Sequence, residues 1–186
     1  LPGMRGALGL PEDAPAPALT AWTFQGPMAR MPESVAPKLG KVNSVVTMDV
    51  EVPSNANGVL YALAGFSGGI TCYVKDGVLC YEFNLFEIQR TKIKARQKLP
   101  TGKVRVDVES KLAAKIGGPM DVTLRVNGKV VGQGQVPAAM SLHFTSNATF
   151  DIGSDTDSPV SLDYFDQAPF AWNGAIGTTK VTYLKK

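Results

Sequence analysis

Four aspartates in one loop are the residues of this sequence best suited to chemistry. They lie between positions 151 and 163, among serine and threonine residues, and are Asp151, Asp155, Asp157 and Asp163. Carboxylates and hydroxyls supply the hard oxygen ligands that calcium takes, although no glutamate closes the loop as an EF-hand requires. The alternative, which we favour, is a solvated loop whose Asp and Ser side chains accept hydrogen bonds from nearby backbone N–H groups. Calcium is the metal ion that this pattern suggests.

An aromatic segment follows the acidic loop directly. Its candidate ligand-binding residues are Tyr164, Phe170, Trp172 and Asn173. Aromatic rings beside Asp and Asn side chains suit a sugar ring, which presents both apolar and polar surface. A segment that packs against the core or a neighbouring domain has the same composition, and this interpretation is favoured. A glycan is the small ligand that the sequence suggests.

The sequence contains little else that catalysis could use. There is one histidine, His143, and there are two cysteines, whereas most nucleophile–base pairs and zinc sites need more. A histidine in a strand with no acid close by in sequence favours a structural role. Asp49 and Glu51 alternate outward on one predicted strand, but glycosidases need two carboxylates that converge on one cleft. We therefore predict no catalytic residues.

The elements that must position these residues are antiparallel strands. Asp76-Gly77 and Asn127-Gly128 interrupt alternating apolar runs, and Asn or Asp before Gly tolerates the positive φ of a tight hairpin turn. About ten strands and almost no helical period predict an all-β fold, a two-layer antiparallel β-sandwich. Closure of one sheet into a barrel is the alternative architecture.

The first hairpin also predicts the state of the two cysteines. A two-residue turn pairs Cys72 with Tyr81 and Tyr73 with Cys80, so the two thiols point to opposite faces of the sheet. A disulfide cannot cross the sheet in that geometry. We expect two buried free thiols.

Composition limits the domain organisation and the partners. Hydrophobic residues make up 44% of the 186-residue chain, enough for the core of one domain. Prolines in the first twenty residues predict an irregular arm or interdomain linker over 1–21, with the β-sandwich domain over 22–186. A formal net charge of +3, with acids and bases alternating along strands, argues against nucleic-acid binding. No apolar run is long enough to span a bilayer, so no membrane partner is expected.

Nine short motifs, taken in order, resemble one known pattern. They lie at 29–37, 51–53, 58–60, 68–69, 73–77, 81–84, 99–103, 126–129 and 150–160. Together they resemble the C-terminal β-sandwich region of large bacterial arylsulfatases, over roughly residues 20–186. The resemblance implies a concanavalin A-like or laminin G-like jelly-roll in a bacterial protein, cytoplasmic or periplasmic.

The resemblance implies a partner and does not bring the sulfatase active site. Sulfatases of this kind make formylglycine in a Cys/Ser-x-Pro-x-Arg motif, which neither Cys72 nor Cys80 begins. We expect a non-catalytic accessory domain without sulfatase activity that contacts the sulfatase catalytic domain of the same polypeptide or shapes substrate access. The alternatives are a carbohydrate-binding, lectin-like module and, less favoured, a jelly-roll glycoside hydrolase.

Overall fold

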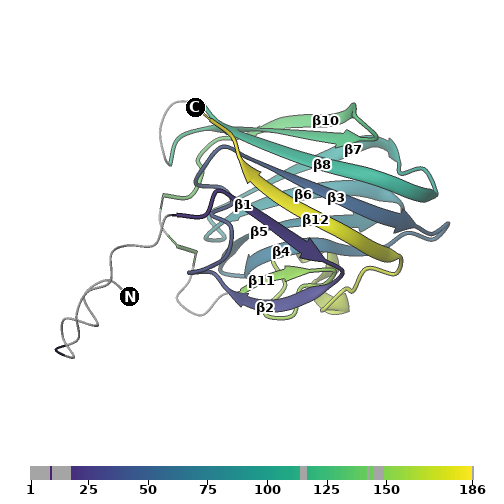
Figure 1. Cartoon of the computed structure of the whole chain (residues 1–186), viewed down its shortest axis with the longest axis horizontal. Helices are drawn as coiled ribbons and strands as arrows, with labels where there is room; N and C mark the ends of the chain where they lie inside the picture. The colour runs from purple at the N-terminus through teal and green to yellow at the C-terminus, as the bar shows by residue number, and fades with distance from the viewer. Residues whose placement is uncertain (1–8, 10–17, 114–116, 142, 145–148, 186) are drawn as a thin grey trace.

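Two six-stranded antiparallel sheets form the protein (Figure 1). The computed structural model describes residue 9 and residues 18–113, 117–141, 143–144 and 149–185. Sheet A has the order β1 (Ala21–Gln25), β12 (Ala175–Tyr183), β3 (Ser44–Val52), β8 (Gly102–Leu112), β9 (Met120–Val126) and β10 (Lys129–Val136). Sheet B has the order β2 (Met28–Pro32), β11 (Thr149–Ile152), β4 (Gly58–Gly65), β5 (Gly68–Lys75), β6 (Val78–Leu85) and β7 (Gln89–Lys98). The predicted two-layer antiparallel β-sandwich is confirmed.

Both predicted hairpin turns are present. The φ angles are 50° and 82° at Asp76 and Gly77, and 50° and 79° at Asn127 and Gly128. Positive φ at both central residues is the type I′ geometry that matches the twist of paired strands. In the first hairpin Cys72 pairs with Tyr81, as predicted.

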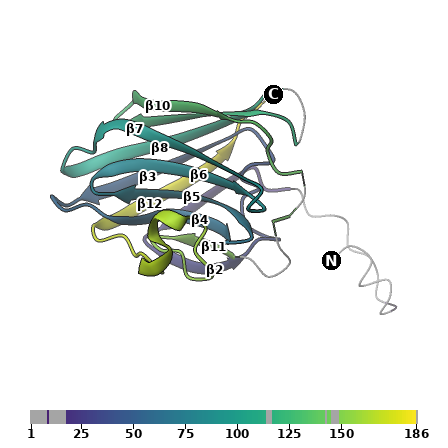
Figure 2. The same cartoon turned by 180° about the vertical axis from the view of Figure 1, so that it is seen from behind.

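The main core lies between the two sheets. Val104, Val106 and Val108 of β8 all point into it, as their alternation with polar residues predicts. Strand β4 is buried along its whole length, because the segment 153–173 covers its outer face and part of the neighbouring strands of sheet B (Figure 2). Under this cover lies a second, smaller apolar cluster of Val59, Ala62, Tyr73, Cys80, Val160 and Tyr164.

Strands β1 and β2 are the two elements that the strand count from sequence missed. They are five residues long and lie at the edges of different sheets, joined across Gly26 with φ of 72°. Trp22, Phe24 and Met28 are only partly buried against the core. Each strand thus presents an apolar row too short to show a clear period.

Two further observations concern the helical content of the chain and its N-terminal segment. The short 3₁₀-helix η1 (Leu162–Gln167) is the helical element of the described residues, and none of their helices could cross a membrane. Most of the predicted arm over 1–21 lies outside the described residues, and β1 begins at Ala21.

Both thiols are expected to be free and unreactive in the folded protein. Cys72 and Cys80 are buried and unpaired. Burial raises the pKa of Cys72 well above its ordinary value and that of Cys80 to about 11, so little thiolate forms near neutral pH. A colorimetric disulfide reagent, without reductant, should detect two thiols in denaturant and almost none under native conditions. Detection of none in denaturant would contradict the hairpin geometry.

Candidate functional site

The open face of sheet A carries a groove of about 890 Å³. Figure 1 looks onto this face, where β12, β3 and β8 run side by side. We call it the sheet A groove; its polar lining residues on β3 and β8 are Thr47, Asp49, Glu51, Lys103, Arg105 and Asp107. These residues alternate with core residues along β3 and β8, so the strand period directs all six to the outer face.

The register of β3 against β8 places complementary groups opposite one another. Thr47 pairs with Asp107, and its hydroxyl donates a 2.6 Å hydrogen bond to the Asp107 carboxylate. Asp49 pairs with Arg105, whose Nε donates to the Asp49 carboxylate at 3.0 Å. Glu51 lies opposite Lys103 in the same register. The groove floor is therefore a ladder of hydrogen-bond donors and acceptors.

The turn at Asn127 and the bulge in β12 border the groove on two sides. At one side the Asn127 side chain accepts a 2.9 Å bond from the Arg105 amide, while the Asn127 amide donates to the Arg105 carbonyl at 2.8 Å. At the other side the pairing of β12 with β3 shifts between Ile176 and Thr179. A Cβ on Gly177 would lie 3.3 Å from the Asp49 carbonyl oxygen, so the glycine keeps this bulge close to β3.

The groove is open to water, which limits the chemistry it can perform. The side chains of Arg105 and Asp49 are 60% and 50% exposed. The Asp49 hydrogen bond and charge raise the pKa of the Arg105 guanidinium, which stays a cation. Planar carboxylates and a guanidinium on a rigid sheet suit the recognition of a ligand rich in hydroxyl groups.

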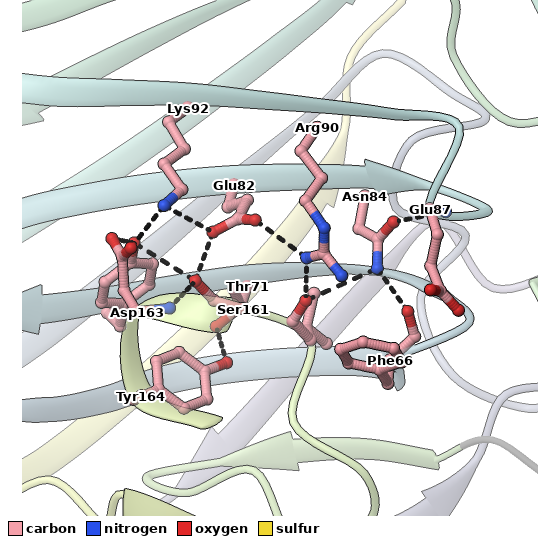
Figure 3. A network of polar contacts seen from close by, with 12 residues as sticks. Phe66, Thr71, Glu82, Asn84, Glu87, Arg90, Lys92, Ser161, Asp163 and Tyr164 are labelled. Atoms are coloured by element: carbon pink, nitrogen blue, oxygen red, sulfur yellow. Dashed lines mark hydrogen bonds and ion pairs between the residues drawn. The ribbon is translucent and has the colours of Figure 1, made fainter. Parts of the chain in front are cut away.

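On sheet B, a network of ion pairs and hydrogen bonds joins the outer face of the sheet to the covering segment 153–173 (Figure 3). Glu82 of β6 is fully buried and accepts a 3.1 Å bond from Arg90 of β7. The same Arg90 nitrogen donates to the Val160 carbonyl of the cover at 2.7 Å. Ser161 donates to the other oxygen of Glu82, and Lys92 bonds to Asp163. This network joins segment 153–173 to β6 and β7.

The predicted calcium ligands are divided between β11, which contains Asp151, and the cover, which contains Asp155, Asp157 and Asp163. Asp151 accepts bonds from the amide and hydroxyl of Thr156, both at 2.7 Å, and from the amide of Arg30. Asp157 accepts from the Thr149 hydroxyl, and Asp163 accepts from the Tyr73 hydroxyl at 2.6 Å. Within the ranges that the structure describes, no three His, Cys, Asp or Glu side chains group closely enough to hold a metal ion. Calcium binding stays a prediction.

The aromatic residues predicted to bind sugar mostly pack inward. Tyr164 is fully buried and stacks on Phe170, with ring centroids 5.1 Å apart. Trp172 is 8% exposed in the main core, and its indole N–H donates to the Ala175 carbonyl. Asn173 is exposed and donates to the Asn55 carbonyl at 2.8 Å. Phe170 and Asn173 are the accessible members of the set, and sugar binding there stays a prediction.

The single histidine lies on the surface. His143 is 59% exposed at its side chain, and its Nδ1 is 3.4 Å from the Glu33 carboxylate and 3.5 Å from Lys41 Nζ. Leu142, beside it in sequence, lies outside the described residues.

Asp155 lies in the cover and is a buried acid whose pKa is raised above its ordinary value. One carboxylate oxygen accepts bonds from the Val160 amide at 2.8 Å and the Tyr164 hydroxyl at 2.7 Å. The other oxygen is buried and has no partner among the described residues. Burial raises the pKa of Asp155 to about 6; the charges of Asp151 and Asp157 add to the rise, and the two hydrogen bonds oppose it.

This pKa predicts a pH-dependent stability. Because the folded state binds the Asp155 proton more tightly than the unfolded chain does, the contribution of this group is fully present below pH about 4. It is lost as the pH rises through about 6. A shift of about two units corresponds to about 3 kcal/mol at most. Urea unfolding at pH 4.5 and 7 measures the change in stability with pH, which should shrink in Asp155→Asn and persist in the control Asp121→Asn, an exposed aspartate on sheet A. An identical pH slope in Asp155→Asn and the parent chain would contradict the assignment.

Comparison with known proteins places the fold. No family model and no curated protein sequence matches the chain. The Ruminococcus gnavus IT-sialidase CBM40 bound to α2,3 sialyllactose has a TM-score of 0.59 and 11% identity, covering 88% of this chain and 94% of that one. The leech intramolecular trans-sialidase complexed with 2,7-anhydro-Neu5Ac has a TM-score of 0.60 and 11% identity, covering 90% and 26%. Mouse laminin α1 domains LG4-5 have a TM-score of 0.55 and 13% identity, covering 87% and 41%.

These likenesses show the fold and nothing finer. The chain shares the jelly-roll β-sandwich fold of these concanavalin A-like and laminin G-like domains, as the sequence resemblance implied. The identities are too low to transfer a ligand or a residue role.

Sequence analysis missed the sheet A groove as a site. In the sequence, acids and bases alternate along strands, and Asp49 and Glu51 stand out only as an acid pair on one predicted strand. The available signal was the opposite charge of the two rows, which favours pairing across neighbouring strands. The register that joins them is a tertiary feature.

Proposed function

We propose that this chain is a non-catalytic carbohydrate-binding module that holds a glycan in the sheet A groove. One observation carries the proposal: a groove of about 890 Å³ lined by paired donors and acceptors on the open face of a lectin-like sandwich. The structural neighbours support it, since one is a sialidase module bound to sialyllactose.

The pairs in the groove match the hydrogen-bonding needs of sugar hydroxyls. Asp49 and Asp107 can accept from hydroxyl groups, while Arg105 and Lys103 can donate to their oxygens. Neighbouring pairs on the same face are about 7 Å apart along a strand, which suits contacts to consecutive sugar rings. Because the sheet holds these side chains before the ligand arrives, binding requires little ordering of the protein.

The test is binding to a glycan array, followed by titration of the strongest ligand. Replacing Arg105 and Asp107 together by alanine should weaken binding about tenfold or more, since each loses hydrogen bonds to the ligand. The matched control replaces Lys111 and Asp121 together by alanine, because this exposed base and acid pair across β8 and β9 outside the groove lining. Absence of any glycan ligand, or equal losses in both variants, would contradict the proposal.

A second candidate is the accessory domain of an arylsulfatase-type polypeptide, docked on its catalytic domain. An exposed apolar cluster at one end of sheet B favours it. The exposed fractions are 43% for Phe86, 84% for Ile88 and 52% for Phe165. The ring of Phe165 meets the ring of Phe66 edge to face, with ring centroids 5.2 Å apart. The complete open reading frame distinguishes this candidate: an upstream Cys/Ser-x-Pro-x-Arg motif supports it, and an unrelated upstream domain contradicts it.

A further inference from the structure

Strand β7 carries a row of five basic residues on the outer face of sheet B. They alternate along the strand and are Arg90, Lys92, Lys94, Arg96 and Lys98. The first two bind Glu82 and Asp163 in the network under the cover. The other three are exposed, and among the described residues none of them forms an ion pair. We call Lys94, Arg96 and Lys98 the β7 basic row.

The pairing of β7 with β6 fixes the direction of this row. Lys94 lies opposite Cys80, and Lys98 lies opposite Val78. Directly paired residues of antiparallel strands share a face, and Cys80 is on the outer face under the cover. Ile93 and Ala95 alternate with the row and point into the main core. Lys94 and Lys98 therefore emerge on the same side, and the exposed Arg96 lies between them, where the register of β7 against β6 shifts.

The β7 backbone is held firmly in place. Strand β10 of sheet A packs against it through two glycines, Gly132 and Gly134. A Cβ on Gly132 would lie 2.7 Å from the Lys94 carbonyl oxygen, and one on Gly134 would lie 2.7 Å from an Ile93 side-chain carbon. This close approach keeps the basic row on a rigid edge, so its charges are positioned before any ligand binds.

The row ends beside a small polar pocket. Lys98 helps to line a pocket of about 270 Å³, together with Asn55, Asn57, Thr101 and the acid Asp76. Amide and hydroxyl groups there can bond to hydroxyl groups of a ligand, and the pocket lining contains no aromatic ring on which a base could stack. Repeated cations beside such a pocket suit a ligand that carries repeated anionic groups and many hydroxyls.

We propose that the β7 basic row binds an anionic polysaccharide, whose sugar units carry sulfate or carboxylate groups. Lys94, Arg96 and Lys98 would contact successive anionic groups, and the pocket beside Lys98 would receive a sugar unit. This site lies on sheet B, on the opposite face of the sandwich from the sheet A groove (Figures 1 and 2). It is therefore an additional binding surface, independent of the function proposed for the groove.

The experiment measures the affinity of the intact chain for dextran sulfate, with neutral dextran as reference, at about 150 mM salt. The test variant replaces Lys94, Arg96 and Lys98 by glutamine. The matched control replaces three exposed lysines elsewhere, Lys38, Lys129 and Lys180, and so removes the same net charge. Circular dichroism and the melting temperature of each variant verify that it is folded.

The β7 variant should bind dextran sulfate about tenfold more weakly or worse, with a shallower salt dependence, because it loses ionic contacts and counterion release. The control should stay within about twofold, since exposed charges far from the site are screened. The Arg105→Ala/Asp107→Ala groove variant should bind dextran sulfate as the parent chain does, which separates this inference from the proposed function. Equal losses in the β7 variant and the control, no binding by the parent chain, or equally tight binding of duplex DNA would overturn the inference.

Discussion

Replacing Arg90 by methionine is expected to lower the free energy of unfolding by about 3–5 kcal/mol, the range for breaking a buried ion pair from one side. Arg90 supports a carboxylate, Glu82, that is fully buried on β6. It also bonds to the Val160 carbonyl of the cover. The variant leaves Glu82 with Ser161 and with Lys92, whose nitrogen is 3.8 Å away.

Two further variants distinguish a buried charge from a general loss of packing. Arg90→Met combined with Glu82→Gln should recover much of the lost stability, because removing both charges avoids the uncompensated carboxylate. Arg105→Met breaks an exposed pair of the same type and should change stability by less than about 1 kcal/mol. Chemical denaturation of the four proteins measures all these values. An Arg90 variant as stable as the parent chain would show that the network does not hold the cover.

Replacing Gly58 by alanine is expected to destabilise the fold by more than about 3 kcal/mol, or to prevent folding. Gly58 has φ of 124°, and a Cβ there would lie 2.4 Å from both the Ala171 carbonyl oxygen and the Trp172 Cα. These are backbone atoms of the cover, which the Val59 amide holds through a 2.8 Å bond to the Phe170 carbonyl. The clash therefore has no flexible side chain that could relieve it.

A second glycine distinguishes the effect of this clash from the effect of backbone strain alone. Gly102 has φ of 89°, and a Cβ there meets no atom within 4 Å. Gly102→Ala should therefore show only the strain of a left-handed residue, about 1–2 kcal/mol. Thermal and urea unfolding of both variants measure the difference. Equal destabilisation would mean that the cover moves freely away from β4.

The elements that the sequence predicts well are those determined by neighbours in the chain. The Asp76-Gly77 turn sets the pairing of Cys72 with Tyr81, because a two-residue hairpin permits one register. The core-facing row from Val104 to Val108 follows from strand alternation alone. Strands β1 and β2 were missed because they are short, lie at the edges and bury their apolar residues only partly.

The sheet A groove and the network around Glu82 depend on contacts between distant parts of the chain. Thr47 meets Asp107 across sixty positions, so neither residue alone indicates a groove. Glu82 alternates with apolar core residues of β6 in the manner of a solvated side chain, yet a segment about eighty positions later buries it. Asp151 and Asp155 accept bonds from backbone amides in the same loop, as the turn-capping alternative for these aspartates described.

Titration of the ¹⁵N-labelled chain with the best ligand from the glycan array, followed by NMR, tests the central claim most directly. We expect saturable shifts of the backbone amides of Thr47, Asp49, Arg105 and Asp107, and of the Asn127 amide at the groove wall. Arg105→Ala combined with Asp107→Ala should abolish them, while Lys111→Ala combined with Asp121→Ala should leave them unchanged. Saturable shifts confined to another face of the molecule, or no saturable shifts for any glycan, would contradict a carbohydrate-binding role for the sheet A groove.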